Sequence, residues 1–147
     1  MRIVSWWFIK LLIRLKFPTV RQLSTADLAT WLSAEDKSKP LLLDARTSEE
    51  YQVSHLRNAK LVPQNIEDLA DEVDCSTPIV VYCSVGYRSS AIARRLNSLG
   101  YKNVFNLSGS IFQWVNENRS VYRDGKLVDA VHPYQKFWQH LLVEPHS

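Results

Sequence analysis

The sequence predicts an α/β fold in which a small, mainly parallel sheet of about five strands is flanked by helices on both faces. Short runs of Leu, Ile and Val alternate along the chain with segments of helical periodicity, a pattern typical of such a sheet. The 147 residues suffice for one domain of ordinary size. A 46% hydrophobic composition with two cysteines and four glycines excludes disulfide-framework, collagen-like and wholly disordered chains.

Residues 1–17 are apolar and basic, and their spacing predicts an amphipathic helix with Trp6, Ile9, Ile13 and Phe17 on one face. The uncharged stretch is far shorter than the roughly 20 residues that span a bilayer, and no small-residue cleavage site follows. Three interpretations remain open. The helix docks on the domain with its basic side chains reaching solvent, it lies on an anionic membrane surface, or it is a transit peptide.

The next elements follow from local signals. Ser24 is a helix-starting residue, Gly100 stops a later helix, and the Asp124-Gly125 pair predicts a tight hairpin turn. In chain order we expect a helix from Ser24, a strand at 41–43 ending at Asp44, a helix at 48–53, a strand at 60–62, a weak helix at 66–73, a strand at 79–82, a helix at 89–99, a strand at 104–107, a helix from 111 and an amphipathic helix over 134–142.

The net charge of +3 is unevenly distributed. Residues 1–23 hold five basic residues and no acidic one, residues 24–120 hold ten basic and twelve acidic ones, and residues 121–147 hold three of each. The basic excess therefore belongs to the first segment, and it does not indicate a nucleic-acid partner.

The two cysteines flank the strand expected at 79–82. A strand rises about 3.3 Å per residue, whereas a disulfide needs Cα atoms within about 7 Å. We therefore expect Cys75 and Cys83 to be free thiols in a reducing, cytoplasmic setting, with Cys75 a bystander.

Cys83 stands where a parallel strand ends and a loop leads into a helix, the usual position of ligand sites in such sheets. A loop of this kind aims backbone N–H groups and a helix N-terminus at one point, which favours an ionised, nucleophilic thiol. Gly86 permits an unusual backbone conformation, and Arg88 supplies a positive charge or a fork of donors. A buried structural cysteine is the alternative that the cysteine alone leaves open.

The loop Cys83-Ser84-Val85-Gly86-Tyr87-Arg88 resembles the Cys-x-x-Gly-x-Arg loop of rhodanese-like sulfurtransferases. Other family signatures occur in the same order, so that the resemblance covers about Val20 to Val121. Ser54, Asn58 and Ser110 stand where the family usually has glycine. The further matching segments are Asp44-Ala45-Arg46, Glu50-Tyr51, His55-Leu56 with Ala59, and Leu107-Ser108-Gly109 with Trp114.

The resemblance implies a domain at 20–121 between a basic arm at 1–19 and an extension at 122–147. It implies that Cys83 carries a persulfide, which the backbone N–H groups of Ser84 to Ser89 stabilise, while Asp44 and Arg46 support the loop or Arg88. Sulfur would pass from thiosulfate, or from a small-molecule or protein persulfide donor, to a thiol or cyanide acceptor. No metal or organic cofactor is expected.

Two other functions compete with this one. Cysteine phosphatases place more residues between Cys and Arg than the four found here, and the tighter loop suits a single sulfur atom better than a phosphate. A non-catalytic or sulfur-relay module that docks a partner or a membrane is the second alternative. An intact Cys83 argues against an inert module but is compatible with a carrier.

Overall fold

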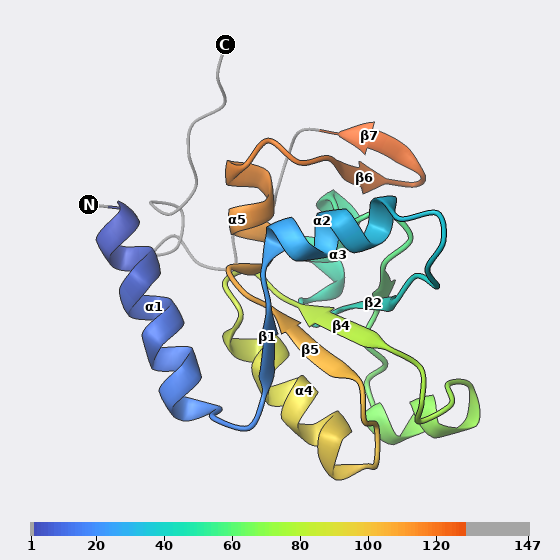
Figure 1. The fold of residues 1–147 in the computed structure, drawn as a ribbon. Coiled ribbons are helices and arrows are strands. Elements are labelled where there is room, and N and C mark those ends of the chain that lie inside the picture. The colour runs from blue at the N-terminus through green and yellow to red at the C-terminus, as the bar shows by residue number, and fades with distance from the viewer. Residues whose placement is uncertain (1, 129–147) are drawn as a thin grey trace.

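A five-stranded sheet with helices on both faces forms the centre of the molecule, shown as a computed structural model in Figure 1. The structure describes residues 2–128, with side chains from residue 6 onward. The strand order is β1-β5-β4-β2-β3, and every pairing within this sheet is parallel. The elements are α1 (Arg2–Lys16), β1 (Arg21–Leu23), α2 (Thr25–Ser33), β2 (Leu41–Asp44), α3 (Ser48–Val53), β3 (Lys60–Leu61), the 3₁₀ helix η1 (Ile66–Asp71), β4 (Ile79–Tyr82), α4 (Tyr87–Ser98), β5 (Val104–Leu107), α5 (Ser110–Asn116), β6 (Val121–Arg123) and β7 (Lys126–Val128).

The sheet separates two apolar cores, and β4 contributes to both. Successive strand residues point to opposite faces, so Val80 and Tyr82 pack with α2 and α5, whereas Ile79 and Val81 pack with α1, η1 and α4. All four side chains are fully buried. The expected α/β architecture is thereby confirmed, and the buried central strand fixes where the loop after Tyr82 emerges.

Local signals placed most helices and the hairpin correctly. The Ser24 hydroxyl accepts a hydrogen bond from the Asp27 N–H at 3.0 Å and caps α2. Asp124 and Gly125 both adopt positive φ, at 52° and 77°, which is the conformation of the primed turn that joins β6 to antiparallel β7.

Three features differ from the expectation. Strand β1 was not foreseen, because it is only three residues long and exists through its pairing with β5. The weakly helical segment forms a 3₁₀ helix. Helix α4 starts at Tyr87, two residues earlier than expected, which places the end of the loop in the first helical turn. The amphipathic helix expected over 134–142 lies outside the described residues.

Helix α1 docks on the domain. Ile13 and Phe17 are 4% and 2% exposed, and Trp6 and Ile9 pack beside them, so that the predicted face is the one that contacts the domain. Among the described residues no helix is long and apolar enough to cross a membrane.

Candidate active site

The Cys83 thiol lies at the carboxyl end of β4, where the chain turns toward α4. Its side chain is almost fully buried. The first turn of α5 holds the start of this loop, because the Ile111 and Phe112 N–H groups donate to the Cys83 and Ser84 carbonyls, each at 3.1 Å. The Cys83 N–H in turn donates to the Ser110 hydroxyl at 3.2 Å. These contacts fix the backbone that carries the sulfur.

Gly86 brings a backbone donor to the sulfur. Its N–H donates to Cys83 Sγ at 3.1 Å. Its φ of 116° is unfavourable for residues with a side chain, and a Cβ there would meet Asn106 Nδ2 at 3.2 Å and Ile13 Cδ1 at 3.3 Å. Glycine is therefore required both for the turn and for the close packing around the loop.

Ser89, in the first turn of α4, contributes a second donor. Its hydroxyl lies 3.3 Å from Cys83 Sγ and 2.5 Å from Asn106 Oδ1, and both are potential acceptors for its single hydrogen. With a neutral thiol, the hydroxyl can donate to Asn106 and accept from the S–H. Once the thiol loses its proton, the same hydroxyl can turn to the sulfur and stabilise the negative charge.

Asn106 is held in the orientation this exchange requires. Its side-chain amide donates to Gln22 Oε1 at 2.7 Å, which leaves its oxygen facing Ser89. Gln22 lies on β1 and pairs in register with Asn106 on β5. The edge strand that the sequence did not predict thus supports the environment of the thiol.

We expect Ser89→Ala to slow the reaction of Cys83 with iodoacetamide at neutral pH by about tenfold, because a thiolate loses one charge-assisted hydrogen bond. The measurement follows alkylation by mass spectrometry in a Cys75→Ser background. Ser90→Ala is the matched control, since the neighbouring Ser90 hydroxyl is also buried but has no hydrogen-bond partner. Equal rates for wild type and the Ser89 variant would contradict this role.

Glu50 of α3 ties the loop together from the other side. Its carboxylate accepts two bonds from the Arg88 guanidinium, at 2.9 and 3.3 Å, and one from the Ser84 hydroxyl at 3.2 Å. Arg88 also donates to the Ser84 hydroxyl at 3.0 Å. The same carboxylate accepts the Thr47 N–H at 3.0 Å and completes a capping box at the start of α3. One buried carboxylate therefore fixes both ends of the loop.

The protonation of Glu50 follows from these contacts. Burial by itself raises the pKa of a carboxyl group, but the hydrogen bonds from Arg88 and Thr47 outweigh burial and lower the pKa of Glu50 below its ordinary value of 4.5. Glu50 is therefore charged at neutral pH and offsets the charge of Arg88.

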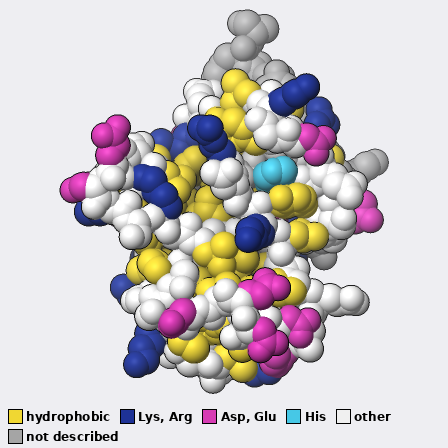
Figure 2. Space-filling model, turned by 90° about the vertical axis from the view of Figure 1, so that its right-hand side faces the viewer, with side chains coloured by type: hydrophobic (Ala, Val, Ile, Leu, Met, Phe, Trp, Pro, Cys, Tyr) yellow, Lys and Arg dark blue, Asp and Glu magenta, His cyan; other side chains and the backbone are white. Residues whose placement is uncertain are grey.

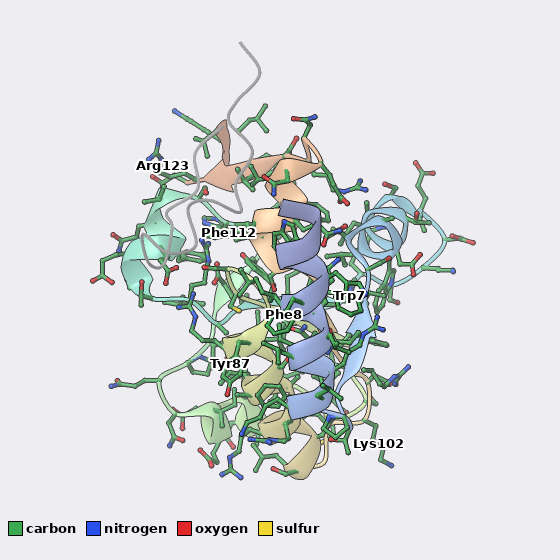
Figure 3. The ribbon with its side chains drawn as sticks, turned by 90° about the vertical axis from the view of Figure 1, so that its left-hand side faces the viewer. Trp7, Phe8, Tyr87, Lys102, Phe112 and Arg123 are labelled. Atoms are coloured by element: carbon green, nitrogen blue, oxygen red, sulfur yellow. The ribbon has the colours of Figure 1, made fainter. Side chains whose placement is uncertain are left out.

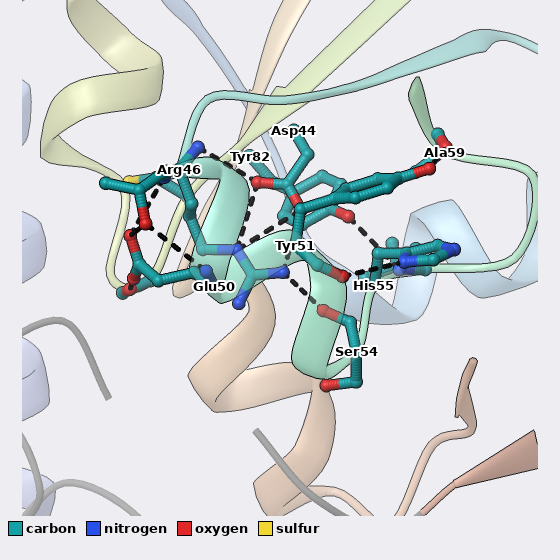
Figure 4. A network of polar contacts seen from close by, with 12 residues as sticks. Asp44, Arg46, Glu50, Tyr51, Ser54, His55, Ala59 and Tyr82 are labelled. Atoms are coloured by element: carbon teal, nitrogen blue, oxygen red, sulfur yellow. Dashed lines mark hydrogen bonds and ion pairs between the residues drawn. The ribbon is translucent and has the colours of Figure 1, made fainter. Parts of the chain in front are cut away.

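Asp44 and Arg46 form a buried ion pair beneath the helix that carries Glu50. Arg46 binds Asp44 in a fully buried ion pair at 2.7 Å and donates to the Ser54 carbonyl at 2.6 Å (Figure 4). The pair joins the end of β2 to the end of α3, and so positions the helix that carries Glu50. Arg88 forms an ion pair with Glu50, a residue to which the sequence analysis gave no site role.

Of the expected loop residues, Gly86 and Ser89 contact the Cys83 sulfur, whereas Ser84 and Arg88 bind Glu50. Ser84, Gly86, Arg88 and Ser89 form the contacts described above. Val85 points into the core and is 6% exposed. Tyr87 lies at the rim, half exposed, with its ring edge-on to Phe17 at 5.2 Å.

Sequence reasoning assigned no site role to Glu50, Asn106, Gln22 or Ser110. The Thr47-x-x-Glu50 spacing is a capping-box signal, which could have located the start of α3 but not the bond to Arg88. Ser110 has a positive φ of 51° where the family has glycine, and its hydroxyl is the acceptor of the Cys83 N–H. Asn58, as expected for Asn in place of glycine, also has a positive φ, of 63°.

Comparison with known proteins identifies the class of this fold and site. The family model for the rhodanese-like domain matches residues 26–117, so the chain belongs to the rhodanese-like family. In solved structures, the chain is similar to the BH2092 protein from Bacillus halodurans, with a TM-score of 0.66 and 24% identity over 82% of this chain and 89% of that one. A rhodanese-related protein from Thermoplasma volcanium is 27% identical, with a TM-score of 0.57 over 69% of this chain and 97% of that one.

Curated relatives match at similar levels of identity. The adenylyltransferase and sulfurtransferase uba4 of Ogataea parapolymorpha is 33% identical over 88 residues, which are 56% of this chain and 23% of that protein. The thiosulfate sulfurtransferase GlpE of Coxiella burnetii is 29% identical over 75 residues, which are 50% of this chain and 70% of that protein. The match thus spans about a quarter of the first relative and over two thirds of the second.

Proposed function

We propose that the protein is a sulfurtransferase that carries a sulfane sulfur on Cys83. The observation that carries this proposal is the position of the Cys83 sulfur at the start of α4. There the sulfur accepts a hydrogen bond from the Gly86 N–H and lies within hydrogen-bond distance of the Ser89 hydroxyl. The match to two relatives named as sulfurtransferases supports it. Two hydrogen-bonding groups close to one sulfur can also stabilise a second sulfur atom bonded to it.

The reaction would proceed in two displacement steps. The Cys83 thiolate attacks the outer sulfur of a donor, a new S–S bond forms, and the donor's own bond to that sulfur breaks with release of sulfite or a thiolate. An acceptor thiolate or cyanide then attacks the terminal sulfur, and the electron pair of the Cys83 S–S bond returns to Cys83. Such covalent catalysis gives ping-pong kinetics. The Gly86 and Ser89 donors stabilise the negative charge in both steps.

A persulfide is a better physiological donor for this site than thiosulfate. Arg88, the one basic residue between Ser84 and Ser89, is neutralised by Glu50 and provides little attraction for a dianion. Tyr87, half exposed at the rim of the loop with its ring against Phe17, offers apolar surface to an organic or protein donor.

We therefore expect kcat/KM for an organic persulfide such as glutathione persulfide to exceed that for thiosulfate by at least about tenfold, equivalent to roughly 1.4 kcal/mol. The measurement is thiocyanate release in the presence of cyanide, with each donor in turn. A low KM for thiosulfate with equal turnover would contradict the donor preference. Absence of thiocyanate with both donors would favour the alternative, a relay or non-catalytic module.

A further inference from the structure

Helix α1 is apolar on two faces, of which only one contacts the domain. Trp6, Ile9, Ile13 and Phe17 pack inward. The opposite side carries five exposed hydrophobic side chains, between 36% and 68% exposed, at positions that form one stripe along the helix. This stripe, the α1 outer face, consists of Trp7, Phe8, Leu11, Leu12 and Leu15.

Helix α1 adjoins the active-site loop. Figure 3 shows Trp7 and Phe8 on the side of the molecule that also carries Tyr87. Tyr87 is half exposed and contacts Phe17 at the end of α1. The inner face of the helix reaches the loop as well, since Ile13 packs where a side chain at Gly86 would lie. The helix that carries the α1 outer face is therefore packed against the loop that carries Cys83.

The charged side chains on α1 and in the residues just after it are all basic. Arg14, Lys16 and Arg21 are exposed, and residues 1–23 contain no acidic residue. A group of exposed acidic residues lies instead on and just after η1, across the molecule from α1 in Figure 1, and acidic side chains gather on the corresponding face in Figure 2. Its members are Glu67, Asp68, Asp71, Glu72 and Asp74. The apolar stripe is thus flanked by the basic side chains of its own segment, with Glu117 near Lys10 and the larger acidic group across the molecule.

We propose that the α1 outer face binds the surface of an anionic lipid bilayer and so holds the loop that carries Cys83 at the membrane. Aromatic and leucine side chains flanked by Lys and Arg are the features of helices that lie in the headgroup region. Trp is especially suited to that interface. The basic side chains of this segment match anionic headgroups, and docking on the described part of the domain uses the other face of the helix. The proposal stands whether or not Cys83 transfers sulfur.

The test is sedimentation of the full chain with vesicles of phosphatidylcholine alone or mixed with phosphatidylglycerol. We expect binding to the anionic vesicles, weakened by salt, and little binding to phosphatidylcholine. The double variant Leu12→Glu and Leu15→Glu should bind at least about tenfold more weakly, because two charges would enter the apolar layer. Leu127→Glu is the matched control, since Leu127 on β7 is 65% exposed but far from α1 in the sequence. It should bind like wild type.

Thermal unfolding of all three proteins shows whether the substitutions leave the fold intact; exposed positions are expected to change stability little. Equal sedimentation of wild type and a folded double variant would overturn the proposal, as would equal binding to both vesicle types. Absence of vesicle binding, combined with wild-type dimers that the double variant abolishes in analytical ultracentrifugation, would assign the face to a second copy of this chain and would also overturn it.

Discussion

Glu50→Ala is expected to destabilise the protein by about 3 kcal/mol, near the lower end of the range for breaking a buried ion pair by removing one partner. The Glu50 side chain is 1% exposed, whereas a quarter of the Arg88 side chain reaches solvent, which moderates the cost of leaving Arg88 without this carboxylate. Ser84 and the Thr47 N–H lose their acceptor at the same time. Urea denaturation followed by circular dichroism measures the change.

Glu49→Ala provides the control, because Glu49 is the exposed neighbour in the same helix and should change the free energy of unfolding by no more than about 0.5 kcal/mol. The pH dependence provides a second check. The lowered pKa of Glu50 means that its stabilisation is present above pH 4.5 and is lost as the pH falls through the folded-state value. The difference between wild type and Glu50→Ala should therefore shrink below pH 4.5. A difference that is absent at neutral pH would refute the role given to Glu50.

Loss of Glu50 should also impair the chemistry. Arg88 and Ser84 would lose the group that fixes both ends of the loop, so the Gly86 N–H would no longer be held on Cys83 Sγ. In Glu50→Ala, assayed well below its unfolding temperature, we expect thiocyanate release to fall more than the folded fraction does.

The sequence predicted those parts of the fold that depend on neighbouring residues. The Ser24 cap, the Asp124-Gly125 turn and the run of β-branched residues before Cys83 are local signals, and the structure confirms the elements they indicate. Strand β1 carries no such signal, because a three-residue segment becomes a strand only when β5 lies beside it. Pairing between distant segments sets its conformation.

In the candidate site, too, local features could be predicted from the sequence, whereas contacts between distant residues could not. The position of Cys83, the glycine turn and the following helix could be inferred from order along the chain. The partners of these groups could not, since Glu50 lies 38 residues from Arg88, and Gln22 lies 84 residues from Asn106. The motif indicated that Asp44 and Arg46 lie near the loop, but only the folded chain shows that the carboxylate of Glu50 meets Arg88.

The basic N-terminal segment also needed the structure. The periodicity of Trp6, Ile9, Ile13 and Phe17 predicted the face that packs on the domain. The exposed stripe on the other side becomes informative only once the inner face is known to be occupied and the loop is known to lie beside it.

The central claim is that Cys83 is the sulfur carrier. It is tested most directly by the intact mass of the protein after incubation with a persulfide or with thiosulfate. We predict that wild type and Cys75→Ser each gain one sulfur atom, that cyanide removes this atom as thiocyanate, and that Cys83→Ser gains none. Cys75 is the exposed cysteine and Cys83 the buried one, so a non-specific addition of sulfur would occur mainly at Cys75. A wild-type protein that gains no sulfur, or a Cys83→Ser variant that still gains it, would contradict the account.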